Sequence, residues 1–406
     1  MGRTHDRSNP TLSFVLALQG RRPPSTTAQP TQDRDREASL TARIAAFDLR
    51  SACGRPTGVG RHLLSMAVAA TAVPGVEVRA YLSDGDIRLP NTIEKVILRP
   101  GGFRWHLAVW RHLRLHPVAA YVSTSLVVPN LPGVPSLPVV LDMSSFRVPQ
   151  HQARRTKIFE HTLMGRAISR HPLIFGSQAA ATDTQGVFPN ARGVVVPPWF
   201  AQRRSPLMGS QAALDGLGVR KPYVLMVGTV EPRKNVLLAA RVVGSLRERG
   251  RDLRLVLVGR RGWSSDDELS ALRELERQGT VIWPGYVTDE QRDALYSDAS
   301  ALLMPSIYEG FGMPLVEAMA AGVPCCCSAI PAFKEVAGDA AIVLDPTQPD
   351  DWVEAIESLL DDPERSDRLR RAGLRRAEMF SVDRTARAFT QALDQGQWPM
   401  VTPAEH

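Results

Sequence analysis

Two glutamates, Glu309 and Glu317, stand eight residues apart in the segment P-S-I-Y-E-G-F-G-M-P-L-V-E. The two glycines of this segment favour a loop whose peptide N–H groups can come close to a ligand. Met313 then begins a predicted helix, where free N–H groups and the helix dipole favour an anion such as a diphosphate. Two acids flanking such a helix start suit a ligand with hydroxyls on either side of a diphosphate, which describes a nucleotide sugar.

The same acid pair is compatible with two further roles. A glutamate in a turn punctuated by glycine and proline is usually only a solvated charge at a helix start. A glycosidase would also bring two carboxylates together, about 5–5.5 Å apart in retaining enzymes and about 6.5–9.5 Å apart in inverting ones. Eight residues of helix span about 12 Å. The spacing therefore disfavours hydrolysis unless the loop folds back.

A second motif, V-G-T-V-E-P-R-K-N, occupies residues 227–235, about 75 residues before the acid pair. It follows an apolar run that predicts a strand, and it puts Lys234 at the start of a predicted helix. The helix dipole disfavours a cation there, so a functional role is favoured over that of a surface lysine. Together the two motifs resemble the donor-site signatures of family 4 retaining glycosyltransferases, in which E-x7-E accompanies a donor-phosphate loop.

This resemblance covers nearly all of residues 43–390 and implies a GT-B fold, with two Rossmann-like, doubly wound parallel-sheet domains facing a cleft. It implies that Lys234, with Arg233 beside it, stabilises the leaving diphosphate. It also implies that Glu309 lies against the donor sugar and that Glu317 accepts hydrogen bonds from the ribose. The predicted catalytic residues are Lys234, Glu309 and Asp142. Donor binding is predicted for Gly228, Thr229, Arg233, Lys234, Gly285, Tyr286, Val287, Glu309, Gly310, Phe311, Gly312, Met313, Pro314, Leu315 and Glu317.

A glycine-rich segment, Gly58, Val59, Gly60 and Arg61, follows the first predicted strand. A dinucleotide fingerprint would need a third glycine at position 63, where this chain has Leu63, so NAD binding is disfavoured. The segment resembles instead the family's glycine-rich loop, which faces donor phosphate and acceptor. The resemblance implies that Arg61 lies near an acceptor phosphate.

Two positions depart from the family's pattern. The strand V-V-L-D ends at Asp142, but many relatives have histidine where this chain has Leu141. Many relatives also carry Gly-Arg where this chain has Gly228-Thr229. These departures leave open the alternative of a catalytically weak or inactive nucleotide-sugar-binding subunit of a polysaccharide assembly system. Ser177 is a lesser site candidate, for which the role of a helix N-cap is favoured.

Length and composition fit two domains, because 406 residues exceed one ordinary domain and 44% of them are hydrophobic. Apolar strands alternating with helices predict a parallel sheet in each domain, covered on both faces. The predicted order is a disordered leader at 1–42, an acceptor domain at 43–200, a linker at 201–220, a nucleotide-sugar domain at 221–383, and a final helix at 384–396 that packs back on the first domain.

Predicted strands lie at 44–49, 76–82, 93–98, 119–124, 138–142, 172–176 and 193–196, then at 223–228, 254–259, 280–283, 300–304, 324–328 and 340–343. Predicted helices lie at 61–72, 105–114 and 151–170, then at 235–249, 265–277, 288–297, 314–321 and 350–360, with a helical, charged segment over 363–396. Cys325, Cys326 and Cys327 fall in one strand and, without C-x-x-C spacing, are interpreted as buried core residues.

Positive charge is concentrated in the first domain. Residues 43–199 hold 18 Arg and Lys against 8 Asp and Glu, a balance of +10 in a chain whose net charge is +7. Such a domain suits an acidic partner. No nucleic-acid motif is present, so an anionic membrane surface or a lipid-diphosphate acceptor is favoured, with an ordinary solvated basic face as the alternative. Two segments concentrate the effect. The segment 104–114 mixes arginines with interface-seeking tryptophans, and the predicted helix at 151–171 carries Arg154, Arg155, Lys157, Arg166 and Arg170.

The sequence thus predicts a retaining, metal-independent hexosyltransferase without a cofactor, since no D-x-D stands at a strand end. Its donor would be GDP-mannose or UDP-glucose, and its acceptor a polyprenyl-diphosphate-linked or other envelope glycan. No stretch approaches the ~20 apolar residues of a membrane span. Free cysteines fit a reducing cytoplasm, so the predicted location is cytoplasmic, peripheral to the inner face of the membrane.

Overall fold

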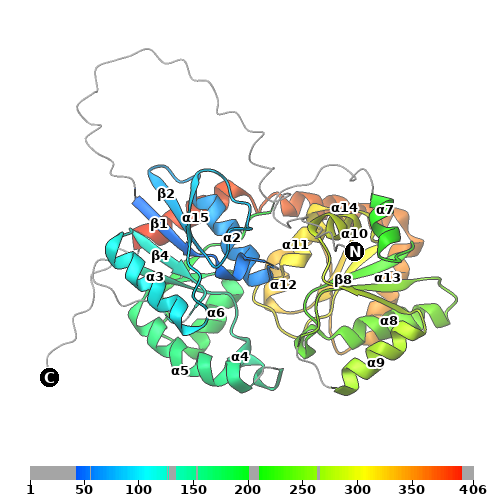
Figure 1. Ribbon diagram of the computed structural model, residues 1–406. Helices are drawn as coiled ribbons and strands as arrows, with labels where there is room; N and C mark the ends of the chain where they lie inside the picture. The colour runs from blue at the N-terminus through cyan, green and yellow to red at the C-terminus, as the bar shows by residue number, and fades with distance from the viewer. Residues whose placement is uncertain are drawn as a thin grey trace, which may run out of the picture.

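The computed structural model describes residues 43–54, 56–125, 127, 134–151, 154–200, 210–262 and 266–395, so the predicted leader lies outside the described residues. The chain folds into two side-by-side domains, each built on one parallel sheet with helices on both faces (Figure 1). The predicted fold class is confirmed. Each described strand begins and ends within two residues of its predicted position.

The first sheet has the strand order β3-β2-β1-β4-β5-β6-β7, with all neighbours parallel. Its central strands read as apolar runs because both faces are covered, and all four residues of β4 are buried. The bounds are β1 (Arg43–Asp48), β2 (Val76–Leu82), β3 (Ile93–Ile97), β4 (Ala120–Ser123), β5 (Ser136–Val140), β6 (Leu173–Phe175) and β7 (Gly193–Val195). The covering helices are α2 (Gly58–Ala70), α3 (Phe103–Leu115), α4 (Ser144–Arg147), α5 (Arg154–Arg170) and α6 (Gln178–Val187).

The predicted start of the first helix at residue 61 was wrong, because α2 already begins at Gly58. The glycine-rich segment is therefore the first helical turn and not a loop before the helix. A Cβ on Gly60 would lie 2.0 Å from the carbonyl oxygen of Ser51. Glycine is required there because the helix start packs directly on the backbone that follows β1.

The second sheet has the order β10-β9-β8-β11-β12-β13, again parallel throughout. Its strands are β8 (Tyr223–Val227), β9 (Arg254–Val258), β10 (Val281–Gly285), β11 (Ala301–Met304), β12 (Cys325–Ser328) and β13 (Ile342–Leu344). Its helices are α7 (Ser210–Gly216), α8 (Val236–Glu248), α9 (Asp266–Arg277), α10 (Asp289–Asp298), α11 (Met313–Ala320), α12 (Pro331–Ala337), α13 (Pro349–Asp361) and α14 (Pro363–Ala377). The three cysteines of β12 are fully buried, as predicted.

The predicted linker at 201–220 is not wholly a linker. Its second half contains α7, whose Leu214 is completely buried in the core of the second domain with Tyr223. Polar residues dominate this segment, and its composition therefore predicted a linker and not the short amphipathic helix α7.

The last helix, α15 (Val382–Gln395), returns to the first domain and packs on α2 (Figure 1). Phe389 is fully buried there, with its ring centroid 5.4 Å from that of Phe47 on β1. The chain therefore crosses between domains twice, between Trp199 and Phe200 and between Phe380 and Val382. The Phe200 amide donates to the Phe380 carbonyl at 3.0 Å, which joins the two crossings.

Both sheets reverse their winding direction once, between β1 and β4 and between β8 and β11. In open α/β sheets ligands bind outside the carboxyl ends of the strands at such a switch point. The topology therefore directs attention to the segments that follow β1, β8 and β11, because these strands border the two switch points.

Removing the Phe389 side chain should weaken the packing of α15 on the first domain. We expect Phe389→Ala to lower the free energy of unfolding by about 3–5 kcal/mol, the usual effect of truncating a buried aromatic residue. Native-state hydrogen exchange should show the loss in the amides of β1. Arg387→Ala, on the exposed side of the same helix, is the control and should change stability by less than about 0.5 kcal/mol. Equal stability of the two variants would show that α15 does not stabilise this domain.

Candidate functional site

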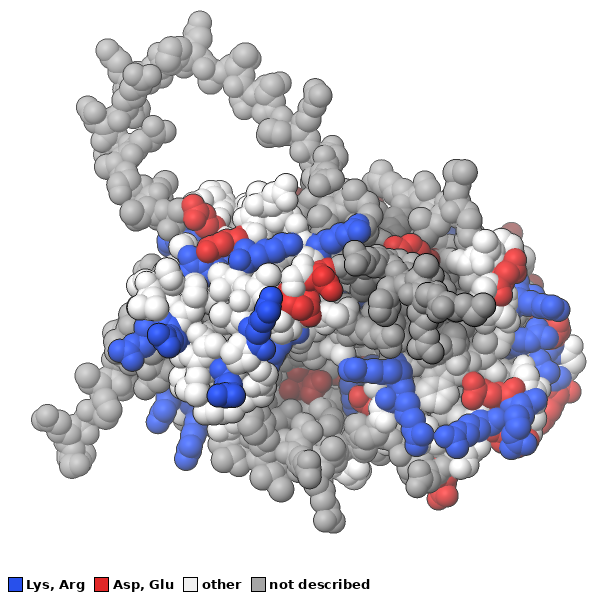
Figure 2. All heavy atoms as spheres, viewed as in Figure 1, with Lys and Arg blue, Asp and Glu red and all other residues white. Residues whose placement is uncertain are grey.

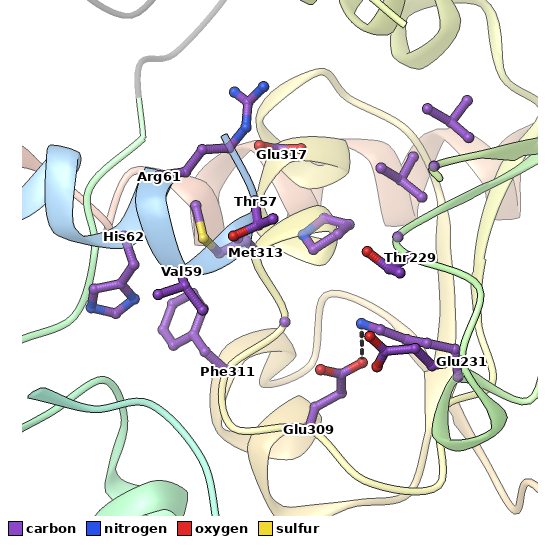
Figure 3. A pocket seen from close by; sticks show the side chains of 18 of the residues that line it. Thr57, Val59, Arg61, His62, Thr229, Glu231, Glu309, Phe311, Met313 and Glu317 are labelled. Carbon is purple, nitrogen blue, oxygen red and sulfur yellow. Dashed lines mark hydrogen bonds and ion pairs between the residues drawn. The ribbon is translucent and has the colours of Figure 1, made fainter. Parts of the chain in front are cut away.

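A cleft of about 430 Å³ lies between the two domains. Figure 3 shows Glu309 and Glu317 toward opposite ends of it, with Val59 and Phe311 on one side and Thr229 on the other. Most of the predicted site residues line this cleft: Gly58, Val59, Arg61, Asp142, Gly228, Thr229, Arg233, Lys234, Tyr286, Val287, Glu309, Gly310, Phe311, Gly312, Met313, Pro314 and Glu317. A volume of this size is typical of small-molecule sites.

Glu309 is the centre of a buried ion cluster. One carboxylate oxygen contacts the Lys234 ammonium and accepts a hydrogen bond from the Ser306 hydroxyl at 2.9 Å. The other accepts from Arg233 Nη1 at 2.9 Å. The Arg233 guanidinium also contacts Glu231 through Nε, at 3.0 Å. Two cations thus face two carboxylates on one wall of the cleft.

The cluster holds Glu309 ionised. Burial alone would raise its pKa, but Lys234 and then Arg233 outweigh burial and lower the pKa to about 2. The acid is therefore a carboxylate at neutral pH, able to accept hydrogen bonds and unsuited to donating a proton. Such a group suits contacts with hydroxyls and not general-acid work.

Lys234 is positioned by a tight turn after β8. Gly228 has φ +153° and packs against the lysine stem, and a Cβ on Gly259 would lie 1.9 Å from the Gly228 carbonyl oxygen. A single 3-10 turn, Pro232–Lys234, then carries both cations. Asn235 takes the left-handed conformation, φ 54°, and α8 begins there. The turn keeps Lys234 only 8% exposed, pointing at Glu309 and not at solvent.

The start of α11 faces the same cleft. Gly312 caps it in a left-handed conformation, φ +103°, and has no side chain to bond the first helical N–H groups. Pro314 has no N–H, and the Leu315 amide donates to the Gly312 carbonyl at 3.0 Å, so the first turn offers an anion the Met313 amide and the helix dipole. A Cβ on Gly312 would lie 2.6 Å from the Phe333 ring, so a larger residue has no room. Free N–H groups at a helix start are an anion site. Because Met313 and Pro314 line the cleft, this helix start lies beside the Lys234–Arg233 pair.

Glu317 belongs to a second, separate charge chain. Its Oε2 accepts from the Tyr296 hydroxyl at 2.9 Å and lies 3.9 Å from Arg292 Nε. Arg292 contacts Asp289 at 2.7 Å, and so does Arg61 of the first domain. Arg61 also lines the cleft, and its predicted place near an acceptor phosphate stays a prediction. Its guanidinium spans the cleft to a carboxylate that is 3% exposed.

Polar contacts join the domains beside Glu309. Ser177 caps α6 by accepting from the Ala180 amide at 2.9 Å, which confirms the N-cap interpretation, and its hydroxyl also contacts the Gly310 carbonyl. Asp142 lines the cleft and accepts from the Ser144 amide at 2.9 Å. A Cβ on Gly310 would lie 1.8 Å from the Leu141 carbonyl oxygen. The donor loop therefore rests directly on the backbone that follows β5.

Three predicted residues do not line the cleft. Gly60 packs on Ser51, Leu315 is fully buried in the second core, and Gly285 ends β10 with φ +78°. Each of the three is adjacent in sequence to a residue that lines the cleft. Membership of a motif therefore predicted more site residues than the structure places in the cleft. Sequence reasoning missed Arg292, which has no motif around it, and His62, which directly follows the glycine-rich turn.

His62 is a buried histidine on the cleft wall. It is 2% exposed, its Nε2 has no hydrogen-bond partner, and its ring meets that of Phe311 edge-on at 6.2 Å. Burial lowers its pKa to about 4, so the ring is neutral at neutral pH. The ring lies near Leu141 on the cleft wall, since a Cβ on Gly176 would contact both side chains.

Within the described ranges, no group of three or more His, Cys, Asp or Glu could hold a metal ion. The same part of the chain contains no helix long and apolar enough to cross a membrane.

The comparisons with known proteins agree with this geometry. Residues 215–376 match the family model described as glycosyl transferases group 1. The chain is 41% identical over 162 residues to O-antigen chain mannosyltransferase B of Escherichia coli, covering 39% of this chain and 42% of that protein. It is 34% identical over 167 residues to MMP alpha-(1->4)-mannosyltransferase of Mycolicibacterium hassiacum, covering 40% of each. The chain spans less than half the length of these curated relatives.

Solved structures match over a much larger part of the fold. WaaG, a glycosyltransferase involved in lipopolysaccharide biosynthesis, has a TM-score of 0.65 at 19% identity, covering 88% of this chain and 100% of the other. Anabaena HepE in complex with UDP-glucose has a TM-score of 0.67 at 17% identity, covering 87% and 99%. Residues 215–376 thus belong to the glycosyl transferases group 1 family, and the described chain has the GT-B fold.

Proposed function

We propose that this protein is a retaining glycosyltransferase that moves a hexose from a nucleotide diphosphate sugar to an envelope glycan or polyprenyl-diphosphate-linked acceptor. One observation carries the proposal: Lys234 and Arg233 converge on Glu309 beside the uncapped start of α11. Two cations beside the positive end of a helix dipole suit the negative charge of a leaving diphosphate.

In the proposed reaction the anomeric C–O bond breaks and negative charge builds on the diphosphate. Lys234 and Arg233 stabilise that charge, and the Met313 amide and the dipole of α11 assist them at the helix start. Glu309, held as a carboxylate, accepts hydrogen bonds from the sugar hydroxyls, while Glu317 does the same for the ribose. Asp142, at the end of β5, faces the sugar from the first domain. No step in this scheme uses a metal or cofactor.

The donor we favour is GDP-mannose, with UDP-glucose second. Two relatives are named mannosyltransferases, and HepE was solved with UDP-glucose. We place the reaction in polysaccharide synthesis for the cell envelope, since one relative is named an O-antigen chain mannosyltransferase and WaaG is involved in lipopolysaccharide biosynthesis. The motifs and ion cluster also support membership of family 4.

A binding subunit without turnover is the second candidate. It is favoured by Leu141, which lines the cleft where many relatives carry histidine, and by Thr229 in the phosphate loop. The neutral His62 ring weakens this alternative, because it places an imidazole near Leu141 on the same side of the cleft.

A panel of GDP-, UDP- and ADP-sugars tests the proposal directly. We expect one donor to raise the thermal midpoint, since a ligand at 100 times its Kd stabilises the fold by about 2.7 kcal/mol. The same donor should be hydrolysed slowly to the nucleoside diphosphate. Stabilisation without any release would favour the binding subunit, and no response to the whole panel would reject a nucleotide-sugar site.

Lys234→Ala should lower turnover about 10²–10³-fold, the usual effect of removing one group that stabilises developing charge. Initial rates of nucleoside diphosphate release measure the change, and circular dichroism checks the fold. Arg241→Ala, an exposed arginine on α8, is the matched control and should retain full turnover. A folded Lys234→Ala variant with wild-type turnover would contradict the leaving-group role.

Replacing Glu317 and replacing Glu309 should change different kinetic quantities. Glu317→Ala should mainly weaken donor binding, because ribose contacts are equal in ground and transition states. Glu309→Ala should lower kcat more than it weakens binding of the free nucleoside diphosphate, because it also frees both cations from their carboxylate. Calorimetry with the nucleoside diphosphate, beside steady-state kinetics, separates the effects. Identical behaviour of the two variants would show that the division of roles is wrong.

A further inference from the structure

Helix α3 presents an unusual face to solvent. Phe103, Leu107 and Leu115 are 64%, 50% and 68% exposed. Arg104, Arg111 and Arg114 are exposed on the same helix. Large apolar residues exposed singly are normal on protein surfaces, but three on one helix form a patch.

The six residues share one side of the helix. At 3.6 residues per turn, positions 103, 104, 107, 111, 114 and 115 fall within a stripe about 120° wide. The opposite side holds Trp105, Val109 and Leu113, all fully buried in the first domain. The Trp105 indole donates to Asp48 at 3.0 Å, which anchors the helix to β1. The exposed stripe is therefore carried on a fixed support.

Within the described part of the chain, the arginines of the stripe have no acidic partner. The helix has no Asp or Glu among its 13 residues. None of its three exposed arginines forms an ion pair with any described residue. Helix α14 provides the contrast, because its exposed Arg368 and Arg371 pair with Asp362, Glu364 and Asp367. Among the described residues, Arg368 and Arg371 on α14 thus have acidic partners, whereas Arg104, Arg111 and Arg114 on α3 have none.

Figure 2 shows blue side chains separated by white surface over the α3 side of the first domain. A partner for this face must be both apolar and negatively charged. A second copy of the chain would bring arginines against arginines, and a nucleic acid would leave the three apolar side chains unsatisfied. An anionic bilayer meets both demands, with apolar side chains entering the acyl boundary and arginines at the headgroups.

We propose that α3 docks the first domain on an anionic membrane surface, lying in the interface with its exposed stripe toward the lipid. The inference concerns a surface away from the cleft and does not require the proposed reaction, although a lipid-linked acceptor would be met at that surface.

The test uses the full chain and vesicles of phosphatidylglycerol and phosphatidylcholine, with sedimentation as the readout. Three variants are compared with the wild type: R104E/R111E/R114E, F103S/L107S/L115S, and the control R368E/R371E/R375E on α14. Each arginine-to-glutamate triple lowers the net charge by 6, from +7 to +1, so the two variants lose the same charge from different helices. Circular dichroism melts establish that each variant is folded.

The wild type should bind anionic vesicles at low salt, release as salt shortens the Debye length, and ignore pure phosphatidylcholine. R104E/R111E/R114E should lower the partition coefficient by about 100-fold, and the α14 control should lower it much less. F103S/L107S/L115S should also release the protein from vesicles. Equal loss in the two arginine triples, or no binding by the wild type, would overturn the proposal. Unchanged binding by F103S/L107S/L115S would reject insertion into a bilayer.

Discussion

A buried carboxylate needs partners, and that requirement organises the centre of this protein. Glu309 is 8% exposed in its side chain, so it is tolerable only with Lys234 and Arg233 against it. The need for these partners holds the loop after β11 against the turn after β8, across the switch point of the second sheet. With Glu231 also present, two cations face two anions, and the wall of the cleft is balanced before any ligand arrives.

This balance shapes what the cleft can accept if the proposed function holds. A diphosphate must draw Lys234 and Arg233 away from Glu309, which would leave a buried carboxylate short of partners. Sugar hydroxyls on the same ligand can replace the lost hydrogen bonds. A bare diphosphate has none to offer, so the arrangement favours the intact donor over the leaving group alone.

The elements of the fold were predictable because buried parallel strands read as apolar runs, and glycine marks the turns that follow them. The donor motifs were predictable because their residues are close in sequence. The pairing of Arg61 with Asp289 was not, since 228 positions separate them and neither has a motif that names the other. The helical start at Gly58 was missed for a related reason: the need for glycine at position 60 comes from Ser51, on a different segment. His62, which sequence reasoning missed, and the contact that Arg61 makes with Asp289 both depend on how the two domains meet.

The two chain crossings between the domains have a mechanical consequence. They lie side by side, joined by the Phe200–Phe380 backbone bond and by the Thr385 hydroxyl, which donates to the Pro197 carbonyl at 2.8 Å. Two bodies linked at neighbouring points retain one easy relative motion, a rotation about an axis through those points. Opening the cleft would thus be a rotation of one domain about a hinge at the two crossings. The hydrogen bonds at this hinge would remain, while contacts between the domains farther from it, such as Arg61 to Asp289, would have to break.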